Sequence, residues 1–600
     1  MTEISFKGKE FVHNHHLSVP FRPLVPHSDK SLGDSALDGN LIIHGDNLHA
    51  LKALLPLYAG KVDCVFIDPP YNTGNEGWCY NDNVNAPMIK EWLSANPIGE
   101  DDGLRHDKWC AMMWPRLRLL HDLLADNGSF WMTIDENEVH RARAILDELF
   151  GAGQFVATVI WHKMYAPKAT VKYFSSDHDY LIVYAKNKES WQPNLLRRTS
   201  EQDEVYRNPD QDPRGRWRPN NLAARNYYSK GTYAITCPSG RVIAGPPAGS
   251  YWRVSEDKLW ELHRDNRIWW GGDGNNVPAP KIYLSEVRQG RVPQTLWHWS
   301  DVGHTQEAKK EVLRIFSDEN RDVFMTPKPT RLLQRVVELG MPSDGLILDS
   351  FAGSGTTAHA VLKANKEDDG HRRFILVEME SYADRLTAER VRRVCRGYKF
   401  TGNLKTELLR QRINWSMLQN SRKLLDEVQK TENLNTHEYD EITKTVKDNE
   451  LIVMGSKSVS ERSPGLDGSF TYCTLGEAIE LDKILSGETL PSYGALGAVI
   501  FNMATNRAFD PMSLREADSY LGQVNDQHLW LIYKPDLDWL KSPEAALTLS
   551  KAKEIAATDK QRKHLVFAPA RFVSRKVLAE QDIPVEFAPL PFALYRIDRS

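Results

Sequence analysis

The 600-residue sequence predicts a doubly wound α/β fold that carries an inserted domain. Short apolar strands alternate with amphipathic helices of ten or more residues, a pattern typical of a mostly parallel sheet covered by helices on both faces. The alternation stops near residue 186 and resumes near residue 330. After residue 451 short strands and helices alternate again, which indicates a separate, small C-terminal α/β domain.

The individual elements follow from the spacing of apolar residues. In the first half we expect strands at 41–44, 62–67, 130–134, 156–161 and 180–184 and helices at 47–59, 109–124 and 138–149. In the second half we expect helices at 330–339, 356–364 and 382–393 and strands at 345–350 and 373–378. The predicted domains are an N-terminal arm (1–38), the first half of the core (39–185), an inserted domain (186–321), the second half of the core (322–400), and an amphipathic helix (404–430) with the small C-terminal domain (together 401–600).

Composition excludes several classes of protein. The chain has 76 Lys and Arg against 80 Asp and Glu, so it is not a generic nucleic-acid coat, although a local basic surface is compatible with this balance. It has no apolar run of membrane-spanning length, so we expect no membrane association. Its six cysteines form no CxxC pair, which argues against a disulfide framework and a cysteine-based zinc site. We therefore expect a reduced, cytoplasmic protein.

The predicted insertion differs from the rest of the chain in charge. Residues 186–300 hold 18 Lys and Arg, 12 Asp and Glu, and 8 of the 17 tryptophans. Basic and aromatic side chains together are typical of a surface that binds nucleic acid. Tryptophans in small cores and solvated surface charge would give the same composition.

The sequence DPPY, formed by Asp68, Pro69, Pro70 and Tyr71, directly follows a predicted strand. Ligands of open α/β sheets bind at such strand ends. A carboxylate and a carbonyl beside a proline can both accept hydrogen bonds from one exocyclic amino group. Tyr71 offers a ring on which a flipped base can stack. A Pro-Pro turn closed by an aromatic residue is the structural alternative.

A second motif, DSFAGSGTT at residues 349–357, joins a predicted strand to a helix. Its glycines let the backbone approach a bulky cofactor, and the helix N-terminus offers N–H donors. Glu378 ends the next strand, where acidic residues commonly hold ribose hydroxyls. The loop lacks the GK[ST] of a Walker A motif and the GxGxxG of dinucleotide sites. A nucleoside with an amino-acid end, such as S-adenosylmethionine, fits both positions.

With DPPY before FxGxG and an insertion between them, the sequence resembles the β-class amino-methyltransferases of DNA. Their fold is a Rossmann-like sheet with a circularly permuted motif order and an inserted target-recognition domain. Further similar segments are HGDNL (44–48), DHDYLIVY (177–184) and TPKPTRLL (326–333). DPRG (212–215), YLSEV (283–287) and VGHTQEAKK (302–310) resemble the modification subunits of type III restriction systems.

The resemblance implies a role for each motif residue. The DPPY residues would carry the chemistry on the base, with Asp68 and the Pro70 carbonyl holding the amino group. The cofactor would be S-adenosylmethionine, without a metal. Its methionine end would be held by Phe351, Gly353, Ser354, Gly355 and Thr356, helped by Asp349 and Lys328. Glu378 would bind the ribose, and Asp46 the adenine amino group.

The expected substrate is an adenine of double-stranded DNA, methylated at N6. The DNA would be held by residues of the insertion, for which we expect Arg214, Arg216, Trp217, Arg218, Tyr227 and Tyr228. The expected partners are a second copy of the chain in a homodimer and a restriction subunit with helicase and nuclease activity.

Other functions stay open at this stage. N4-cytosine methylation uses the same geometry, although Asp as the first motif residue favours adenine in this family. A DNA-specificity subunit without catalysis would be expected to have damaged motifs, and both motifs are intact. A nucleotide-binding or dehydrogenase protein would need different glycine spacing, and cytosine carbon-5 chemistry would need a Pro-Cys pair that the chain lacks.

Overall fold

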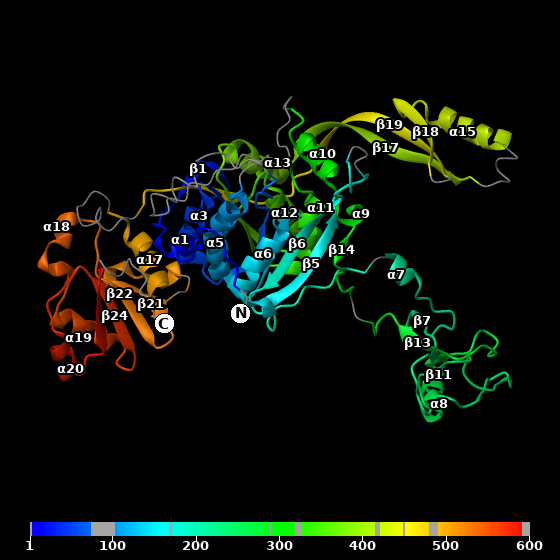
Figure 1. Cartoon of the computed structure of the whole chain (residues 1–600), viewed down its shortest axis with the longest axis horizontal. Coiled ribbons are helices and arrows are strands. Elements are labelled where there is room, and N and C mark those ends of the chain that lie inside the picture. The colour runs from blue at the N-terminus through cyan, green and yellow to red at the C-terminus, as the bar shows by residue number, and fades with distance from the viewer. Residues whose placement is uncertain are drawn as a thin grey trace. The chain divides into compact units, whose positions relative to one another are not determined.

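The computed structural model describes residues 3–73, 103–167, 171–198, 200–287, 290–318, 326–413, 421–447, 450–478, 490–505, 507 and 509–590. It divides into two compact units, shown in Figure 1. Unit 1 is Met1–Pro193 together with Gln294–Ser600, and unit 2 is Asn194–Pro293.

A ten-stranded sheet forms the centre of unit 1, in the order β1-β20-β2-β16-β15-β3-β4-β6-β5-β14. The strands from β20 to β4 run parallel, and β6 is antiparallel to both of its neighbours. Their bounds are β1 Leu24–Leu32, β2 Leu41–His44, β3 Val62–Ile67, β4 Leu124–Ile134, β5 Phe155–His162, β6 His178–Ala185, β14 Leu296–Trp297, β15 Leu346–Asp349, β16 Arg373–Glu378 and β20 Phe470–Leu475. This confirms the predicted doubly wound sheet.

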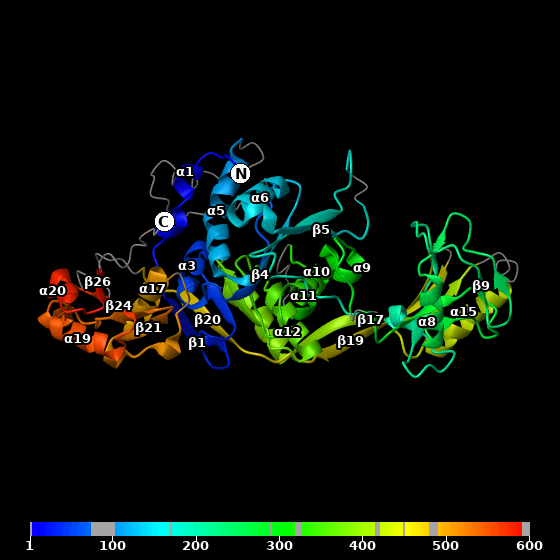
Figure 2. The ribbon, with the colours of Figure 1, turned by 90° about the horizontal axis from the view of Figure 1, so that it is seen from below.

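Helices cover both faces of this sheet, as Figure 2 shows. One face carries α3 (Asn47–Tyr58), α5 (Arg105–Leu123) and α6 (Val139–Leu146), and the other carries α11 (Thr330–Gly340) and α12 (Thr356–Asp368). α13 (Glu389–Arg396) packs against α12. The central strands are buried on both faces, and all four residues of β15 are buried. That double burial explains why these strands read as continuous apolar runs.

The N-terminal segment, predicted as an arm, is packed against the core. It forms α1 (Lys9–Val12), α2 (His15–Ser18) and β1, which pairs antiparallel with β20 at the edge of the sheet. Val12 is 1% exposed, within the main core. Lys9 Nζ lies 2.8 Å from a carboxylate oxygen of Glu148. The short elements lack a sustained period, and their contacts are made at long range, so local patterning could not reveal them.

The segment after the core also differs from the predicted helix 404–430. β17 (Tyr398–Arg412), β18 (Glu441–Lys447) and β19 (Glu450–Ser463) form a three-stranded antiparallel sheet, and the helix α15 spans Ser421–Asn435. The chain then returns to the central sheet as β20. The strands pair residues as distant as Tyr398 and Ser463, a pairing that local periodicity does not report.

The C-terminal domain has its own four-stranded sheet, β21-β22-β24-β26. Its elements are α17 Tyr493–Thr505, β21 Tyr520–Val524, β22 Gln527–Leu531, α18 Leu537–Leu540, β23 Ala546–Leu547, α19 Leu549–Thr558, β24 Lys563–Ala568, β25 Ala570–Arg571, α20 Arg575–Glu580 and β26 Val585–Pro589. Two apolar clusters, one around Leu496 and Leu531 and one around Ile555 and Val566, form its core.

Unit 2 is built from short strands and turns around a small core. Its elements are α7 Ser200–Glu204, β7 Trp217–Pro219, β8 Ala223–Ala224, β9 Ile235–Thr236, β10 Val242–Ile243, β11 Tyr251–Trp252, α8 Glu256–Arg264, β12 Ile268–Trp269 and β13 Ala279–Tyr283. The unit is narrower than the predicted insertion 186–321. β14, α9 (Trp299–Val302) and α10 (Thr305–Ile315) already belong to unit 1.

Within the ranges that the structure describes, no helix has both the length and the apolar character needed to cross a bilayer.

A pair of neighbouring substitutions tests the packing of the N-terminal segment. Val12→Asp would place a carboxylate in the core and should lower the melting temperature by roughly 5 °C or more. Phe11→Asp introduces the same group one residue away, where the side chain is 43% exposed, and should have little effect. Thermal unfolding followed by circular dichroism measures both. Equal melting temperatures for the two variants would mean that the segment is a detached arm.

Candidate active site

Asp68 lies directly beyond the end of β3, and two donors hold its carboxylate. Thr133 Oγ1, on the neighbouring strand β4, donates to Asp68 Oδ1 over 2.5 Å. Lys328, in the segment before α11, forms an ion pair with Oδ2. Sequence reasoning missed Thr133. Thr133 could have been found from its position near the end of β4, the strand that pairs with β3.

Lys328 differs from its predicted place on the cofactor side. Besides its ion pair with Asp68, its ammonium lies 5.1 Å from the centroid of the Tyr71 ring. Because Asp68 and Tyr71 are the predicted base contacts, Lys328 belongs to the base side of the site in this structure. A ligand amino group that bonds to Asp68 Oδ2 would compete with this ion pair.

Tyr71 is tied to strand β6. Its hydroxyl donates to Asp179 Oδ2 over 3.4 Å, and Lys163 Nζ lies 2.5 Å from Asp179 Oδ1. Desolvation raises the pKa of the Tyr71 hydroxyl well above its ordinary value, so this group is a neutral donor. Desolvation also raises the pKa of Asp179, although Lys163 opposes that shift. These contacts orient the Tyr71 ring from the neighbouring strands.

The carbonyl groups of the two prolines are in different situations. Trp109 Nε1, on α5, donates to the Pro70 carbonyl over 2.8 Å. Among the described residues none donates a hydrogen bond to the Pro69 carbonyl. Pro69 is therefore a better candidate than Pro70 for the second acceptor of an amino group.

Asn72 fixes the turn that follows DPPY, and sequence reasoning missed it. Its φ of 61° is left-handed, a conformation that Asn tolerates better than most residues. The side chain is fully buried, and its Nδ2 donates to Glu138 Oε1 over 2.5 Å and to the Arg105 carbonyl over 3.2 Å. The turn is thereby tied to the first residues of α5 and α6.

The glycine motif forms a tight loop between β15 and α12. Asp349, 2% exposed, accepts the Phe351 N–H over 3.0 Å and the Thr357 hydroxyl over 2.5 Å. Gly353 and Gly355 have left-handed φ of 50° and 77°. A Cβ at Gly355 would lie 3.0 Å from the Thr387 carbonyl. Both glycines are therefore required by conformation, and the second also by space.

Glu378, at the end of β16, meets this loop. Its Oε2 accepts the Gly353 N–H over 2.7 Å, and its Oε1 accepts the Glu380 N–H over 2.9 Å. Burial raises the pKa of both Glu378 and Asp349 to about 7. Two desolvated acids thus flank the glycine loop. Such shifted pKa values are common at functional sites.

Asp46 lies at the end of β2 and caps helix α3. Its Oδ1 accepts the N–H groups of Leu48 (2.9 Å) and His49 (3.2 Å), and Oδ2 lies 3.5 Å from Arg116 Nη2. The neighbouring Gly45 N–H donates to the Glu378 carbonyl over 3.0 Å. The structure thus brings Asp46 to the same edge of the sheet as Glu378.

Arg390, which sequence reasoning did not single out, holds the glycine loop from behind. It is fully buried on α13, and its Nη1 donates to Ser354 Oγ (3.0 Å) and Thr356 Oγ1 (2.8 Å). Its Nη2 lies 3.2 Å from a carboxylate oxygen of Glu311. The hydroxyls of Ser354 and Thr356, predicted to contact the cofactor, are therefore engaged inside the protein.

The predicted DNA-binding residues fall into two groups. Trp217 is 2% exposed, its indole N–H donates to Asp210 over 2.8 Å, and its ring packs on Trp269, so it is a core residue. Arg214 is paired with Asp212 and Asp265. On the surface lie Arg216 and Tyr227, the latter 77% exposed, together with Tyr228; Arg218 is half-buried. The structure buries the ring of Trp217 against Trp269, so this predicted DNA contact lies inside unit 2 and not on its surface.

The chain is similar to a protein family and to several known proteins. The family model described as DNA methylase matches residues 62–389. The StyLTI Mod subunit, a type III restriction-modification enzyme of Salmonella typhimurium, is 34% identical over 392 residues, which are 63% of this chain and 58% of that protein. The EcoPI Mod subunit of Escherichia phage P1 is 29% identical over 57% of both chains. The chain thus spans somewhat more than half the length of these Mod subunits.

Two further similarities concern shorter proteins. The type II methyltransferase M.KpnI of Klebsiella pneumoniae is 30% identical over 58% of this chain and 82% of its own. Among solved structures, the PvuII cytosine-N4-specific DNA methyltransferase aligns with 60% of this chain and 89% of its own at 12% identity and a TM-score of 0.32. The family model covers more than half of the 600 residues, including DPPY, the glycine loop and Glu378. The chain therefore belongs to the DNA methylase family, as its motifs predicted.

Proposed function

We propose that this chain transfers a methyl group from S-adenosylmethionine to N6 of an adenine in duplex DNA. The observation that carries the proposal is the adjacency of β3 and β15, which pair in parallel from Cys64–Ile347 to Val65–Leu348. DPPY follows the first strand and the glycine loop the second. The connections then diverge, through α5 to β4 and through α12 to β16. Such a switch point is where open α/β sheets bind ligands.

The residues at the glycine loop fit S-adenosylmethionine. Helix α12 begins at Thr356, and its N-cap residue Gly355 has no side chain to cap it, so the first N–H groups can bind the carboxylate of an amino acid. The carboxylates of Glu378 and Asp46 lie at the ends of neighbouring strands and can accept from ribose and adenine groups. Bound there, the cofactor supplies a methyl group on a sulfonium, and Phe351 and Gly353 line the approach.

The base side supplies two acceptors and a ring. In the proposed complex the adenine leaves the duplex and stacks on Tyr71, and its amino group donates to Asp68 and to the Pro69 carbonyl. Lys328 then gives up its ion pair with Asp68 Oδ2. Thr133 keeps hold of Oδ1 and so fixes the carboxylate. The rate comes mainly from this alignment of the amino nitrogen with the methyl group.

N4-cytosine methylation is the alternative for this site, since cytosine presents a similar amino group. Asp68 at the head of the motif supports adenine.

We also propose that the chain forms a homodimer, works beside a restriction subunit as the modification and specificity component, and acts in the cytosol of a bacterium or archaeon. The similarity to type III Mod subunits supports these proposals.

The product identifies the reaction. We expect purified chain incubated with labelled S-adenosylmethionine and genomic DNA from a strain without methylases to yield N6-methyladenine, measured by mass spectrometry of the nucleosides. N4-methylcytosine alone would replace adenine by cytosine and leave the mechanism in place. 5-Methylcytosine, or no product on any DNA, would refute the proposed function.

Two substitutions separate chemistry from cofactor binding. Asp68→Ala removes one amino-group acceptor, so transfer should fall by roughly a hundredfold or more while affinity for S-adenosylmethionine persists. Gly353→Leu forces a large side chain into a left-handed turn, so cofactor affinity should fall at least about tenfold. Calorimetry and single-turnover transfer measure the two effects. Comparable losses of cofactor affinity in both variants would contradict this division of roles.

The acidity of Glu378 predicts a pH dependence. The ribose hydroxyls need the ionised carboxylate, and burial raises its pKa to about 7. Cofactor affinity should therefore fall below pH 7, by at most about tenfold per pH unit for one proton, and level off above it. Asp349 also titrates near 7, so the part due to Glu378 is the difference between wild type and Glu378→Gln. Identical pH profiles for the two proteins would exclude Glu378 as the ribose acceptor.

A further inference from the structure

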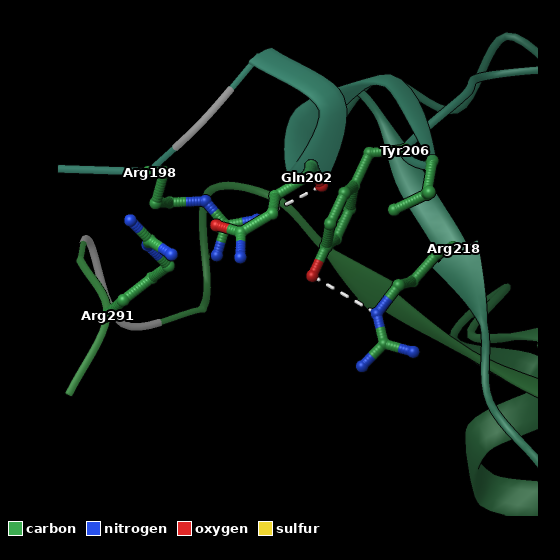
Figure 3. A pocket seen from close by; sticks show the side chains of 6 residues that line it. Arg198, Gln202, Tyr206, Arg218 and Arg291 are labelled. Carbon is green, nitrogen blue, oxygen red and sulfur yellow. Dashed lines mark hydrogen bonds between the residues drawn. The ribbon is translucent and has the colours of Figure 1, made fainter. Parts of the chain in front are cut away.

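Unit 2 contains a pocket in whose lining Arg218 is the one residue that was predicted from the sequence to bind DNA. Its volume is about 400 Å³, and its lining consists of Arg198, Gln202, Val205, Tyr206, Arg218 and Arg291. Figure 3 shows Arg198 and Arg291 on one side and Arg218 on the other, with Tyr206 and Gln202 between them. Three arginines from separated parts of the chain thus face one space.

The arginines are held in place by contacts that leave guanidinium nitrogens for a ligand. Arg218 Nε donates to the Tyr206 hydroxyl over 3.1 Å, and Arg291 Nε donates to the Arg197 carbonyl over 3.4 Å. Arg198 is the most constrained, with Nε 2.7 Å from Asp203 Oδ1 and Nη2 3.3 Å from the Gln202 carbonyl. Among the residues that the structure describes, no carboxylate forms an ion pair with Arg218 or Arg291.

Tyr206 organises the pocket. Its side chain is buried, and the guanidinium groups of Arg198 and Arg218 lie 5.5 and 5.8 Å from its ring centroid. Because arginine packs well on aromatic rings, the Tyr206 ring gives both guanidinium groups a fixed support at the pocket. Arg291 is brought in by the bridge between its backbone and that of Leu196.

The lining indicates the chemistry of the ligand. Guanidinium groups only donate hydrogen bonds, and the Tyr206 hydroxyl already accepts one from Arg218. The major-groove edge of a guanine presents two acceptors, which suit a single arginine. A phosphate presents acceptor oxygens in several directions and a negative charge that several guanidinium groups can share. The pocket therefore suits a phosphate better than a base. Unit 2 as a whole has 16 Lys and Arg against 11 Asp and Glu, in a chain that is acidic overall.

We propose that Arg198, Arg218 and Arg291 clamp one backbone phosphate of duplex DNA, so that this pocket positions unit 2 on its substrate without reading sequence. The proposal rests on the proposed DNA substrate and adds to it a phosphate site and its residues. Val205, 57% exposed at the rim, can pack on the adjoining sugar. Phosphate contacts of this kind fix the register of a protein on DNA.

Salt dependence of binding tests the clamp. The probe is a fluorescent random-sequence duplex of 30 base pairs, titrated without S-adenosylmethionine over a range of salt concentrations. Arg218→Gln or Arg291→Gln should lower affinity by up to roughly tenfold near 0.1 M salt. Because both arginines hold the same phosphate, the double variant should lose about one unit of salt slope in total rather than two.

Matched variants exclude simpler explanations. Arg264→Gln makes the same charge change at an exposed position on α8 and should leave binding nearly unchanged. Arg218→Lys keeps the charge and should keep most of the salt slope. If Arg218→Gln fails to fold, Arg291→Gln remains, since its Nε contact is only a backbone carbonyl. Wild-type affinity in the folded glutamine variants, or an equal loss in Arg264→Gln, would overturn the proposal.

Two further measurements distinguish binding of a DNA phosphate from binding of free phosphate, and distinguish the phosphate site from the proposed methyl transfer. Inorganic phosphate alone should compete only weakly, and tight phosphate binding with unchanged DNA binding would overturn the assignment to DNA. Methyl transfer is assayed independently of binding. Arginine-dependent DNA binding in a chain that methylates nothing would support the pocket and refute the proposed function, whereas methylation with unchanged binding in the variants would do the reverse.

Discussion

The parallel pairing of β3 with β15 is the constraint on which the site depends. These strands are separated by almost 280 residues of sequence, yet Cys64 lies opposite Ile347 and Val65 opposite Leu348. A side-chain contact reinforces this pairing, because Asp63 accepts the Leu346 N–H over 2.8 Å. With this register, DPPY and the glycine loop leave the sheet at one edge. The chemistry of either motif is of little use without the other.

The neighbouring strands then add the groups that orient the site. β4 contributes Thr133 to Asp68, and β6 contributes Asp179 to Tyr71. Behind the glycine loop, buried Arg390 binds two of its hydroxyls and faces Glu311 of α10. A buried cation is costly unless it is paired and hydrogen-bonded. Its presence here indicates that the loop's conformation depends on a polar network that spans α10, α12 and α13.

The sequence predicted those parts of the molecule that local patterns encode. The core strands and helices have the right spacing of apolar residues, and motifs at strand ends located Asp68, Asp349 and Glu378. Local patterns did not predict the secondary structure of segments whose conformation depends on pairing with residues distant in sequence. Residues 24–32 look irregular but form an edge strand of the sheet, and residues 404–412 read as helix but pair with β19. Thr133 and Arg390 were not predicted for the same reason, since each hydrogen-bonds to a segment distant in sequence. Lys328 was assigned to the cofactor by family resemblance, and only the structure shows its ammonium at Asp68.

In the proposed complex, one edge of the sheet holds cofactor and base side by side. A crystal structure of the protein with S-adenosylhomocysteine and a duplex that contains its target sequence would show this arrangement. We expect the amino-acid end of the ligand at the Gly353 turn and an extrahelical adenine on Tyr71, its amino group within hydrogen-bond distance of Asp68, with Lys328 displaced. A target base still stacked in the duplex, or a ligand bound away from the ends of β15 and β16, would contradict it.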